Sequence, residues 1–205
     1  MNKILLGIYF LFTVNLYALT LVDENNTTRE ESNYDKLLKN CESGNADECL
    51  TLGLMYANAN TLKQDFEKAG QFYSKACSGK NETACFELGI LYDYGRGVKK
   101  EYKKAIQMYT LSCDYGSTKG CFELGQRYQS GLVVRQDFTK AVKYYSKACY
   151  NKNNDACISL GLIYFNGTGV KLNESLAKEL FGKACDNSSL LGCKYFKQLN
   201  ESGVR

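Results

Sequence analysis

The side chains with the clearest chemical potential in this sequence are ten cysteines, whose spacing is regular. They lie at positions where gaps of eight and twenty-eight residues alternate: Cys41, Cys49, Cys77, Cys85, Cys113, Cys121, Cys149, Cys157, Cys185 and Cys193. An even number of cysteines favours disulfide bonds if the chain is exported, which residues 1–19 predict as described below. Thiolate metal sites use C-x2-C or C-x4-C spacings, and neither occurs here. We therefore expect disulfides, no metal site and no cofactor.

One serine has a spacing that is typical of a nucleophile. Ser175-Leu-Ala-Lys178 is an S-x-x-K match, and on a helix this spacing lets the lysine assist the serine of β-lactamases. The partner motifs S-D-N and K-T-G are absent, and the chain has no His, which excludes Ser-His-Asp and Cys-His catalysis. We assign no catalytic residue, and we expect Ser175 to be a surface residue of a helix.

The cysteines mark an internal repeat of 36 residues. A fixed period of about 20 to 50 residues is typical of a solenoid. Four full units run from Cys49 to Cys77, Cys85 to Cys113, Cys121 to Cys149 and Cys157 to Cys185. Besides the two cysteines, four columns are identical in all units: Leu52/Leu88/Leu124/Leu160, Gly53/Gly89/Gly125/Gly161, Tyr56/Tyr92/Tyr128/Tyr164 and Ala69/Ala105/Ala141/Ala177. The fold prediction is an all-α, α/α-solenoid of 36-residue helix-turn-helix repeats.

Each unit is expected to hold two antiparallel helices, A and B. Helix A follows a polar residue that can cap its first backbone N–H groups: Asn45, Asn81, Ser117, Asn153 or Ser189. Helix B begins near an acidic or amide side chain: Asp65, Glu101, Asp137 or Asn173. A left-handed C-terminal cap is expected shortly after each helix B: Gly44, Gly79, Gly116, Asn151 and Asn187.

The glycine and aromatic columns predict how the helices pack. A glycine inside a helix costs about 1 kcal/mol against alanine, so its recurrence in helix A indicates a close approach by a neighbouring helix. Two aromatic columns are expected to pack in the core rather than form a stacking ladder for ligands: Tyr56/Tyr92/Tyr128/Tyr164 and Tyr73/Tyr109/Tyr145/Phe181.

The repeat also favours one disulfide pattern among the many that ten cysteines allow. One cysteine lies in the last turn of helix B and the next in the first turns of the following helix A. A short turn brings these ends to the distance that a disulfide requires. The predicted disulfide-stapled pairs are Cys41–Cys49, Cys77–Cys85, Cys113–Cys121, Cys149–Cys157 and Cys185–Cys193.

The N-terminal residues predict export. Residues 1–19 read as a signal peptide because Lys3 precedes an apolar run from Ile4 to Val14, with an uncleaved membrane anchor as the alternative. Residues 20–33 form a polar linker, residues 34–201 the solenoid and residues 202–205 a tail. Asn25 lies in an acidic-extended glycosylation sequon, Asp23-Glu-Asn-Asn-Thr27, where a glycan could attach, but the favoured interpretation is an unmodified disordered linker. We expect a periplasmic or secreted monomer with no membrane span after cleavage.

The second unit contains a recognisable motif set. Leu88-Gly-x-x-Tyr92, Gly95-Arg-Gly97-Val98 and Lys104-Ala105 resemble the Sel1-like repeat, a relative of the tetratricopeptide repeat. The cysteine pattern is similar to the cysteine-rich, exported Sel1-like proteins of bacteria, the Hcp family. This resemblance implies a scaffold that binds a protein, peptide or peptidoglycan-like ligand of the cell wall. It also implies β-lactam (penicillin) binding and weak β-lactamase hydrolysis, without a catalytic motif that maps onto this chain.

Candidate ligand-binding residues lie where the units differ. The net charge of +4, without a long charge run, predicts no nucleic-acid partner. Solenoids bind on a concave surface, here expected from helix A of the two central units. The candidates are Glu87, Tyr94, Glu123, Gln126 and Arg127. The alternative is that these are ordinary solvated residues without a ligand. Arg127 is hypothesised to face a ligand carboxylate because its column is otherwise apolar: Met55, Leu91 and Ile163.

Overall fold

The computed structural model describes residues 33–58 and 62–204. The signal peptide expected at 1–19, most of the linker and the Asn25 sequon lie outside these residues. After a helical segment at 33–42 come α2 (Ala46–Asn58), α3 (Phe66–Ser78), α4 (Glu82–Tyr94), α5 (Tyr102–Asp114), α6 (Thr118–Ser130), α7 (Phe138–Tyr150), α8 (Asn154–Asn166), α9 (Glu174–Asp186) and α10 (Leu190–Glu201). None of these helices is both long and apolar enough to cross a membrane.

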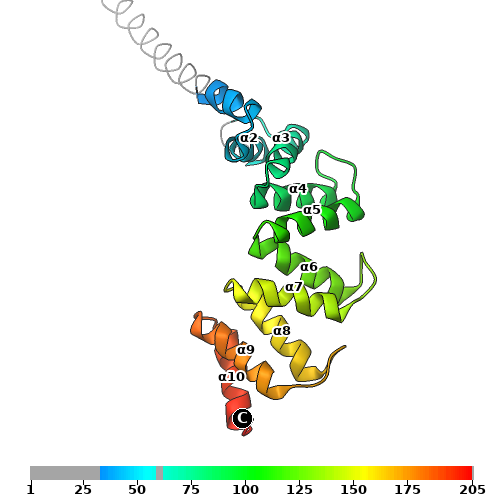
Figure 1. The fold of residues 1–205 in the computed structure, drawn as a ribbon, viewed down its shortest axis with the longest axis vertical. Helices are drawn as coiled ribbons and strands as arrows, with labels where there is room; N and C mark the ends of the chain where they lie inside the picture. The colour runs from blue at the N-terminus through cyan, green and yellow to red at the C-terminus, as the bar shows by residue number, and fades with distance from the viewer. Residues whose placement is uncertain (1–32, 59–61, 205) are drawn as a thin grey trace, which may run out of the picture.

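The helices form antiparallel pairs that follow one another along the long axis of the molecule (Figure 1). Each helix packs against the one before it and the one after it. The even-numbered helices are the predicted helices A, and α3, α5, α7 and α9 are the predicted helices B. The prediction of an all-α solenoid of helical hairpins is confirmed.

Polar caps begin these helices at the predicted residues. Before α4, α6, α8 and α10 a side-chain oxygen accepts a hydrogen bond from the backbone N–H three residues later: Asn81, Ser117, Asn153 and Ser189. Asn45 accepts from two N–H groups at the start of α2. Asp65, Asp137 and Asn173 cap α3, α7 and α9 in the same way, whereas Glu101 begins α5 without a side-chain bond.

The left-handed residue after each helix B is only partly where the sequence predicts it. Gly44 and Gly116 have positive φ, but Gly79, Asn151 and Asn187 have φ of −79°, −86° and −86°. The left-handed position is always the third residue after the cysteine, and in these units it is Lys80, Lys152 and Ser188. The next N–H bonds a carbonyl five residues back, which is a Schellman motif. Gly79 instead permits a close approach, because a Cβ there would lie 2.7 Å from the Cβ of Ala46.

The glycine column of helix A does mark a close helix contact. A Cβ at Gly53, Gly89, Gly125 or Gly161 would lie only 2.5–2.6 Å from a ring of the paired helix B. The rings that fill this space are almost fully buried: Tyr73, Tyr109, Tyr145 and Phe181, each 1% exposed. Each ring therefore lies directly on the backbone of helix A, and the predicted core packing of this column is confirmed.

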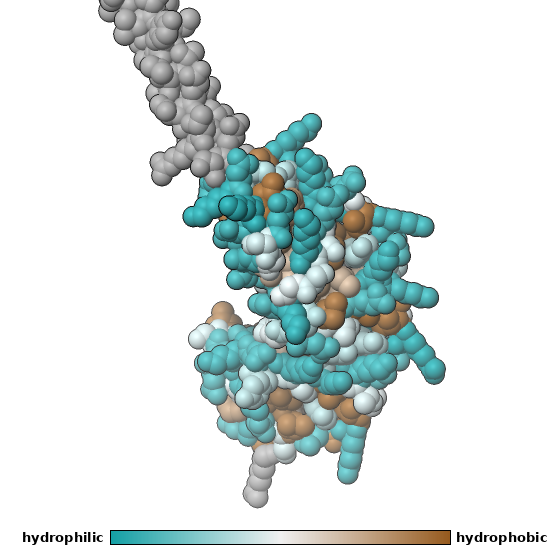
Figure 2. Space-filling view, turned by 45° about the horizontal axis from the view of Figure 1, so that its top comes forward, coloured by the Kyte–Doolittle hydropathy of each residue, from teal (hydrophilic) through white to brown (hydrophobic). Residues whose placement is uncertain are grey.

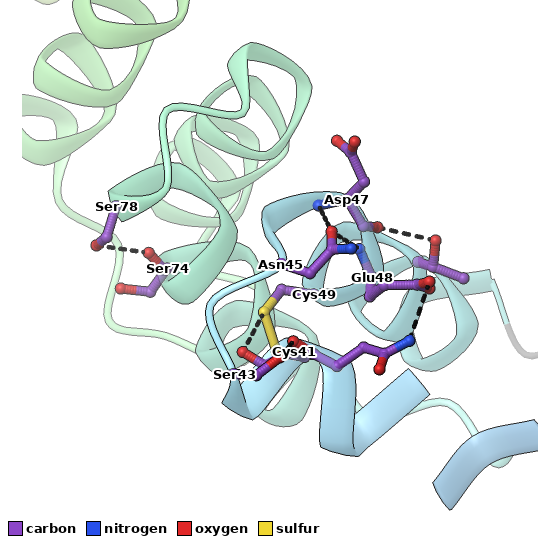
Figure 3. Close-up of a disulfide and its surroundings, with 10 residues drawn as sticks. Cys41, Ser43, Asn45, Asp47, Glu48, Cys49, Ser74 and Ser78 are labelled. Atoms are coloured by element: carbon purple, nitrogen blue, oxygen red, sulfur yellow. Dashed lines mark hydrogen bonds between the residues drawn. A yellow bond between two sulfur atoms is a disulfide. The ribbon is translucent and has the colours of Figure 1, made fainter. Parts of the chain in front are cut away.

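Five disulfides join each helix B to the following helix A. They are Cys41–Cys49, Cys77–Cys85, Cys113–Cys121, Cys149–Cys157 and Cys185–Cys193, with Cα–Cα distances of 4.4–4.7 Å. This is the local pairing that the spacing predicts. Figure 3 shows the first bond beside the turn that Asn45 caps. Cys185 and Cys193 are half-buried, whereas the other eight cysteines are buried.

Candidate ligand-binding surface

The five candidate residues lie on two successive helices A. Glu87 and Tyr94 belong to α4, and Glu123, Gln126 and Arg127 belong to α6. Tyr94 is 63% exposed and Gln126 is exposed, while the other three are half-buried. We refer to these five residues as the helix-A surface.

Arg127 is bound to carboxylates of the protein itself. Its guanidinium lies 2.5 Å from Asp93 Oδ2 and 3.4 Å from Glu123 Oε2. Asp93 is 5% exposed and belongs to α4, so this ion pair ties adjacent repeats together. Desolvation lowers the pKa of Arg127, but attraction to Asp93 and Glu123 outweighs it and raises that pKa overall. A ligand carboxylate at Arg127 must compete with both residues, and its proposed ligand role stays a prediction.

Sequence reasoning missed Asp93, although its column carries a signal. The residues there are Ala57, Asp93, Gln129 and Phe165, which differ strongly in polarity. Tyr109 donates a hydrogen bond to Asp93 over 3.4 Å, and Tyr145 donates to Gln129 over 2.6 Å. The fourth unit pairs Phe165 with Phe181, which has no hydroxyl to satisfy.

The first unit lacks such a polar partner for its tyrosine hydroxyl. It combines Ala57 with Tyr73, and the buried Tyr73 hydroxyl has no hydrogen-bond partner among the described residues. A buried hydroxyl without a partner lowers stability. Where this column carries a polar residue, that residue therefore accepts a hydrogen bond from the tyrosine hydroxyl of helix B.

Removing two equivalent tyrosine hydroxyls should have different effects on stability. Tyr145→Phe should lower the free energy of unfolding by about 1 kcal/mol, because Gln129 loses its donor. Tyr73→Phe should leave it unchanged or raise it by up to about 1 kcal/mol. Urea unfolding of both variants measures the difference. Equal losses in the two variants would contradict this account of the column.

Glu87 is the candidate with an unsatisfied charge. It is half-buried and makes no hydrogen bond or ion pair with the residues that the structure describes. Burial raises the pKa of its carboxyl, and the nearby charge of Lys119 partly opposes this. Both side chains line a depression of about 290 Å³ between α4 and α6, together with Glu82, Thr83, Phe86, Gly116, Ser117 and Thr118. The depression thus contains a carboxylate and an ammonium group that form no ion pair with each other.

The S-x-x-K match does not form a nucleophile pair. Ser175 is exposed in the first turn of α9. Lys178 donates a hydrogen bond to the carbonyl of Val204 over 2.6 Å, and its Nζ lies 5.8 Å from the centre of the Phe196 ring. The lysine therefore holds the C-terminal residues against α9, and the described contacts provide no activation of Ser175.

Known proteins share this architecture. The family model of the Sel1 repeat matches residues 49–81, 83–117, 118–153 and 154–189. Cysteine-rich protein B of Helicobacter pylori is 35% identical, with a TM-score of 0.51 over 67% of this chain and 98% of that one. A protective antigen of uropathogenic Escherichia coli with an SLR fold is 28% identical, with a TM-score of 0.77 over 82% of this chain and 36% of its own length.

A Sel1 repeat protein from Oxalobacter formigenes shares the fold at 23% identity, with a TM-score of 0.70 over 86% of this chain and 74% of that one. This chain thus spans about a third of the E. coli antigen. No curated protein sequence matches it significantly.

Proposed function

Because this chain belongs to the Sel1 repeat family, we propose that it is an exported scaffold that binds a protein partner through the helix-A surface. Sel1 repeats are suited to protein–protein interaction. The five disulfides indicate an oxidising environment outside the cytoplasm. Periplasm and exterior both meet this requirement.

The observation that carries this proposal is that the carboxylate of Glu87 is half-buried and has no hydrogen-bond partner among the described residues. A half-buried carboxylate without a partner has lost part of its hydration and gained no hydrogen bond in return. A partner segment with a Lys or Arg side chain supplies the missing donor in a charge-assisted hydrogen bond. The exposed ring of Tyr94, on the same helix, adds the kind of aromatic area that is enriched at interfaces. The partner is therefore a peptide segment that carries a basic residue.

The buried framework also supports a binding role for this surface. The columns that hold the repeats together are nearly invariant, whereas Glu87 and Glu123 alternate with Thr51 and Ser159 in the other units. Repeat proteins use such variable positions for recognition and the invariant ones for stacking. β-lactam binding stays an implication of the resemblance, and no contact among the described residues supports it.

A displayed library of random peptides tests the proposal and does not require the natural partner. Peptides selected on the wild-type chain should carry Lys or Arg and should bind Glu87→Arg at least about tenfold more weakly, because like charges then meet. Titration of synthetic selected peptides, by isothermal calorimetry, measures the affinities.

The matched control for this experiment is Glu179→Arg. Glu179 is 59% exposed on α9, where it pairs with Lys183, so its reversal changes the net charge equally and leaves the helix-A surface intact. The selected peptides should bind this control as they bind the wild type. Peptides that bind all three proteins equally well would refute a role of the helix-A surface.

A further inference from the structure

A second surface feature lies among other helices, between α7, α8 and α9. It is a groove of about 570 Å³ lined by Ser146, Cys149, Tyr150, Lys152, Leu160, Tyr164, Leu176, Leu180, Lys183, Asp186 and Asn187. The volume lies in the range of ligand-binding clefts. Its apolar lining comes mainly from α8 and α9, through Leu160, Tyr164, Leu176 and Leu180. Small hydrophobic patches also appear near the C-terminal end in Figure 2.

The equivalent place in the preceding unit is filled by an aromatic ring. There Tyr144 stacks on Tyr128, with ring centres 5.7 Å apart and planes 8° from parallel. In the first unit Phe72 stacks on Tyr56 in the same way, at 5.8 Å and 6°. The corresponding pair in the groove is Tyr164 with Leu180, whose side chain has no ring. Stacked aromatic pairs are a favourable geometry, and here one partner is missing.

A lysine over the tyrosine is missing as well. Lys68, Lys104 and Lys140 lie 5.0–5.3 Å from the ring centres of the helix-A tyrosines in units one to three. In the fourth unit this position is Leu176. Within residues 33–58 and 62–204, Tyr164 has neither an aromatic nor a cationic side chain against its ring.

The ion pair that connects α5 to α7 has no equivalent between α7 and α9. Lys147 of α7 pairs with Asp114 of α5 over 3.2 Å. The equivalent residues at the groove are Lys183, which pairs with Glu179 of its own helix over 2.7 Å, and Tyr150, which is 89% exposed. Among the described residues, no ion pair therefore connects α9 to α7 at this place, and the groove stays accessible.

We infer that this groove binds a tyrosine side chain of an extended peptide segment, whose ring packs on Tyr164 beside Leu180. Ser146 lines the same groove and offers a hydroxyl to a bound phenol. Beside the ring site, Lys152, Asn187 and the exposed Tyr150 offer hydrogen bonds and contact area for the rest of the peptide. The site shares no residue with the helix-A surface, so either proposal can fail alone.

The chain contains no Trp, which makes a tryptophan-containing peptide a background-free probe. Acetyl-Gly-Gly-Trp-Gly-Gly-amide should show a saturable change in indole fluorescence with the wild-type protein. The same peptide with Tyr should displace it, and the same peptide with Ala should not. Absence of saturable binding at millimolar peptide would overturn the proposal.

Leu180→Tyr and Leu180→Met form the decisive pair of variants. The new tyrosine places a ring equivalent to that of Tyr144 into this groove and should weaken the probe's binding about tenfold, because the site is then occupied from within. Methionine is the residue of the second unit at this position, Met108, and should leave binding unchanged. Equal binding to both variants would show that the probe binds elsewhere.

Two further measurements keep the result unambiguous. If Leu180→Tyr fails to fold by circular dichroism, Leu176→Lys covers Tyr164 as in the other units and should weaken binding similarly. Sedimentation of the peptide-free protein tests a second copy as the occupant. A concentration-dependent dimer that Leu180→Tyr abolishes would overturn the assignment to a peptide partner.

Discussion

Complete reduction of the five disulfides should unfold the solenoid at room temperature without any denaturant. Each bond closes a loop of nine residues, for which chain entropy predicts about 2–3 kcal/mol of stabilisation. Five such loops therefore contribute about 10–15 kcal/mol, which is comparable to the whole free energy of unfolding of a typical domain. Because most helix contacts join neighbours along the chain, few distant contacts compensate for the loss. Far-UV circular dichroism with and without a phosphine reductant measures the change.

The position of each disulfide predicts an order of reduction. Cys185–Cys193 is half-buried at the C-terminal end, so limiting reductant should open it first, as alkylation and peptide mapping will show. Replacing this pair with Ser should lower the free energy of unfolding less than replacing Cys113 and Cys121 with Ser. The second pair joins the two halves of the solenoid, so its loss weakens the contact between them. A fully reduced chain that keeps a cooperative melting transition would contradict the dominant role of the disulfides.

Asp93→Ala should lower the free energy of unfolding by about 3 kcal/mol at neutral pH. The substitution leaves Arg127 with only the longer contact to Glu123, and it removes the acceptor of the buried Tyr109 hydroxyl. Removing the buried partner is costly because the guanidinium of half-buried Arg127 is then only partly rehydrated. Urea unfolding at neutral pH provides the measurement.

The chain itself offers the control for this prediction. One repeat earlier the equivalent pair is apolar, Ala57 with Leu91, and the column of Arg127 also holds a methionine, Met55. The double variant Asp93→Ala with Arg127→Met should therefore recover most of the stability that Asp93→Ala loses, since an apolar pair replaces the ion pair. No recovery in the double variant would show that Asp93 stabilises the protein through Tyr109 alone.

These variants also separate the two interpretations of Arg127. If Arg127→Met lowers stability but leaves the affinity of a selected peptide unchanged, its role is to join α4 and α6. If the affinity falls as well, its guanidinium contacts the ligand in addition to Asp93. The stability and binding measurements must therefore be made on the same proteins.

Much of this molecule follows from sequence alone, because the features concerned act over short distances and recur. The caps at Asn81, Ser117 and Asn153 are determined by a side chain and the backbone three residues away. The disulfides close loops of nine residues, so spacing alone indicates their partners. The column of Gly89 and Gly125 marked a close approach wherever it recurred, since no other residue fits under the ring.

The tertiary structure decided what depends on residues about one repeat apart. Asp93 and Arg127 are separated by 34 positions, and only the stacking of α6 on α4 brings their charges together. The groove at Tyr164 arises because Leu176 and Leu180 replace larger or charged side chains of earlier units, a difference whose effect depends on how α8 and α9 pack. Repetition thus determined the framework, while contacts between particular side chains of neighbouring units determined the surfaces available for binding.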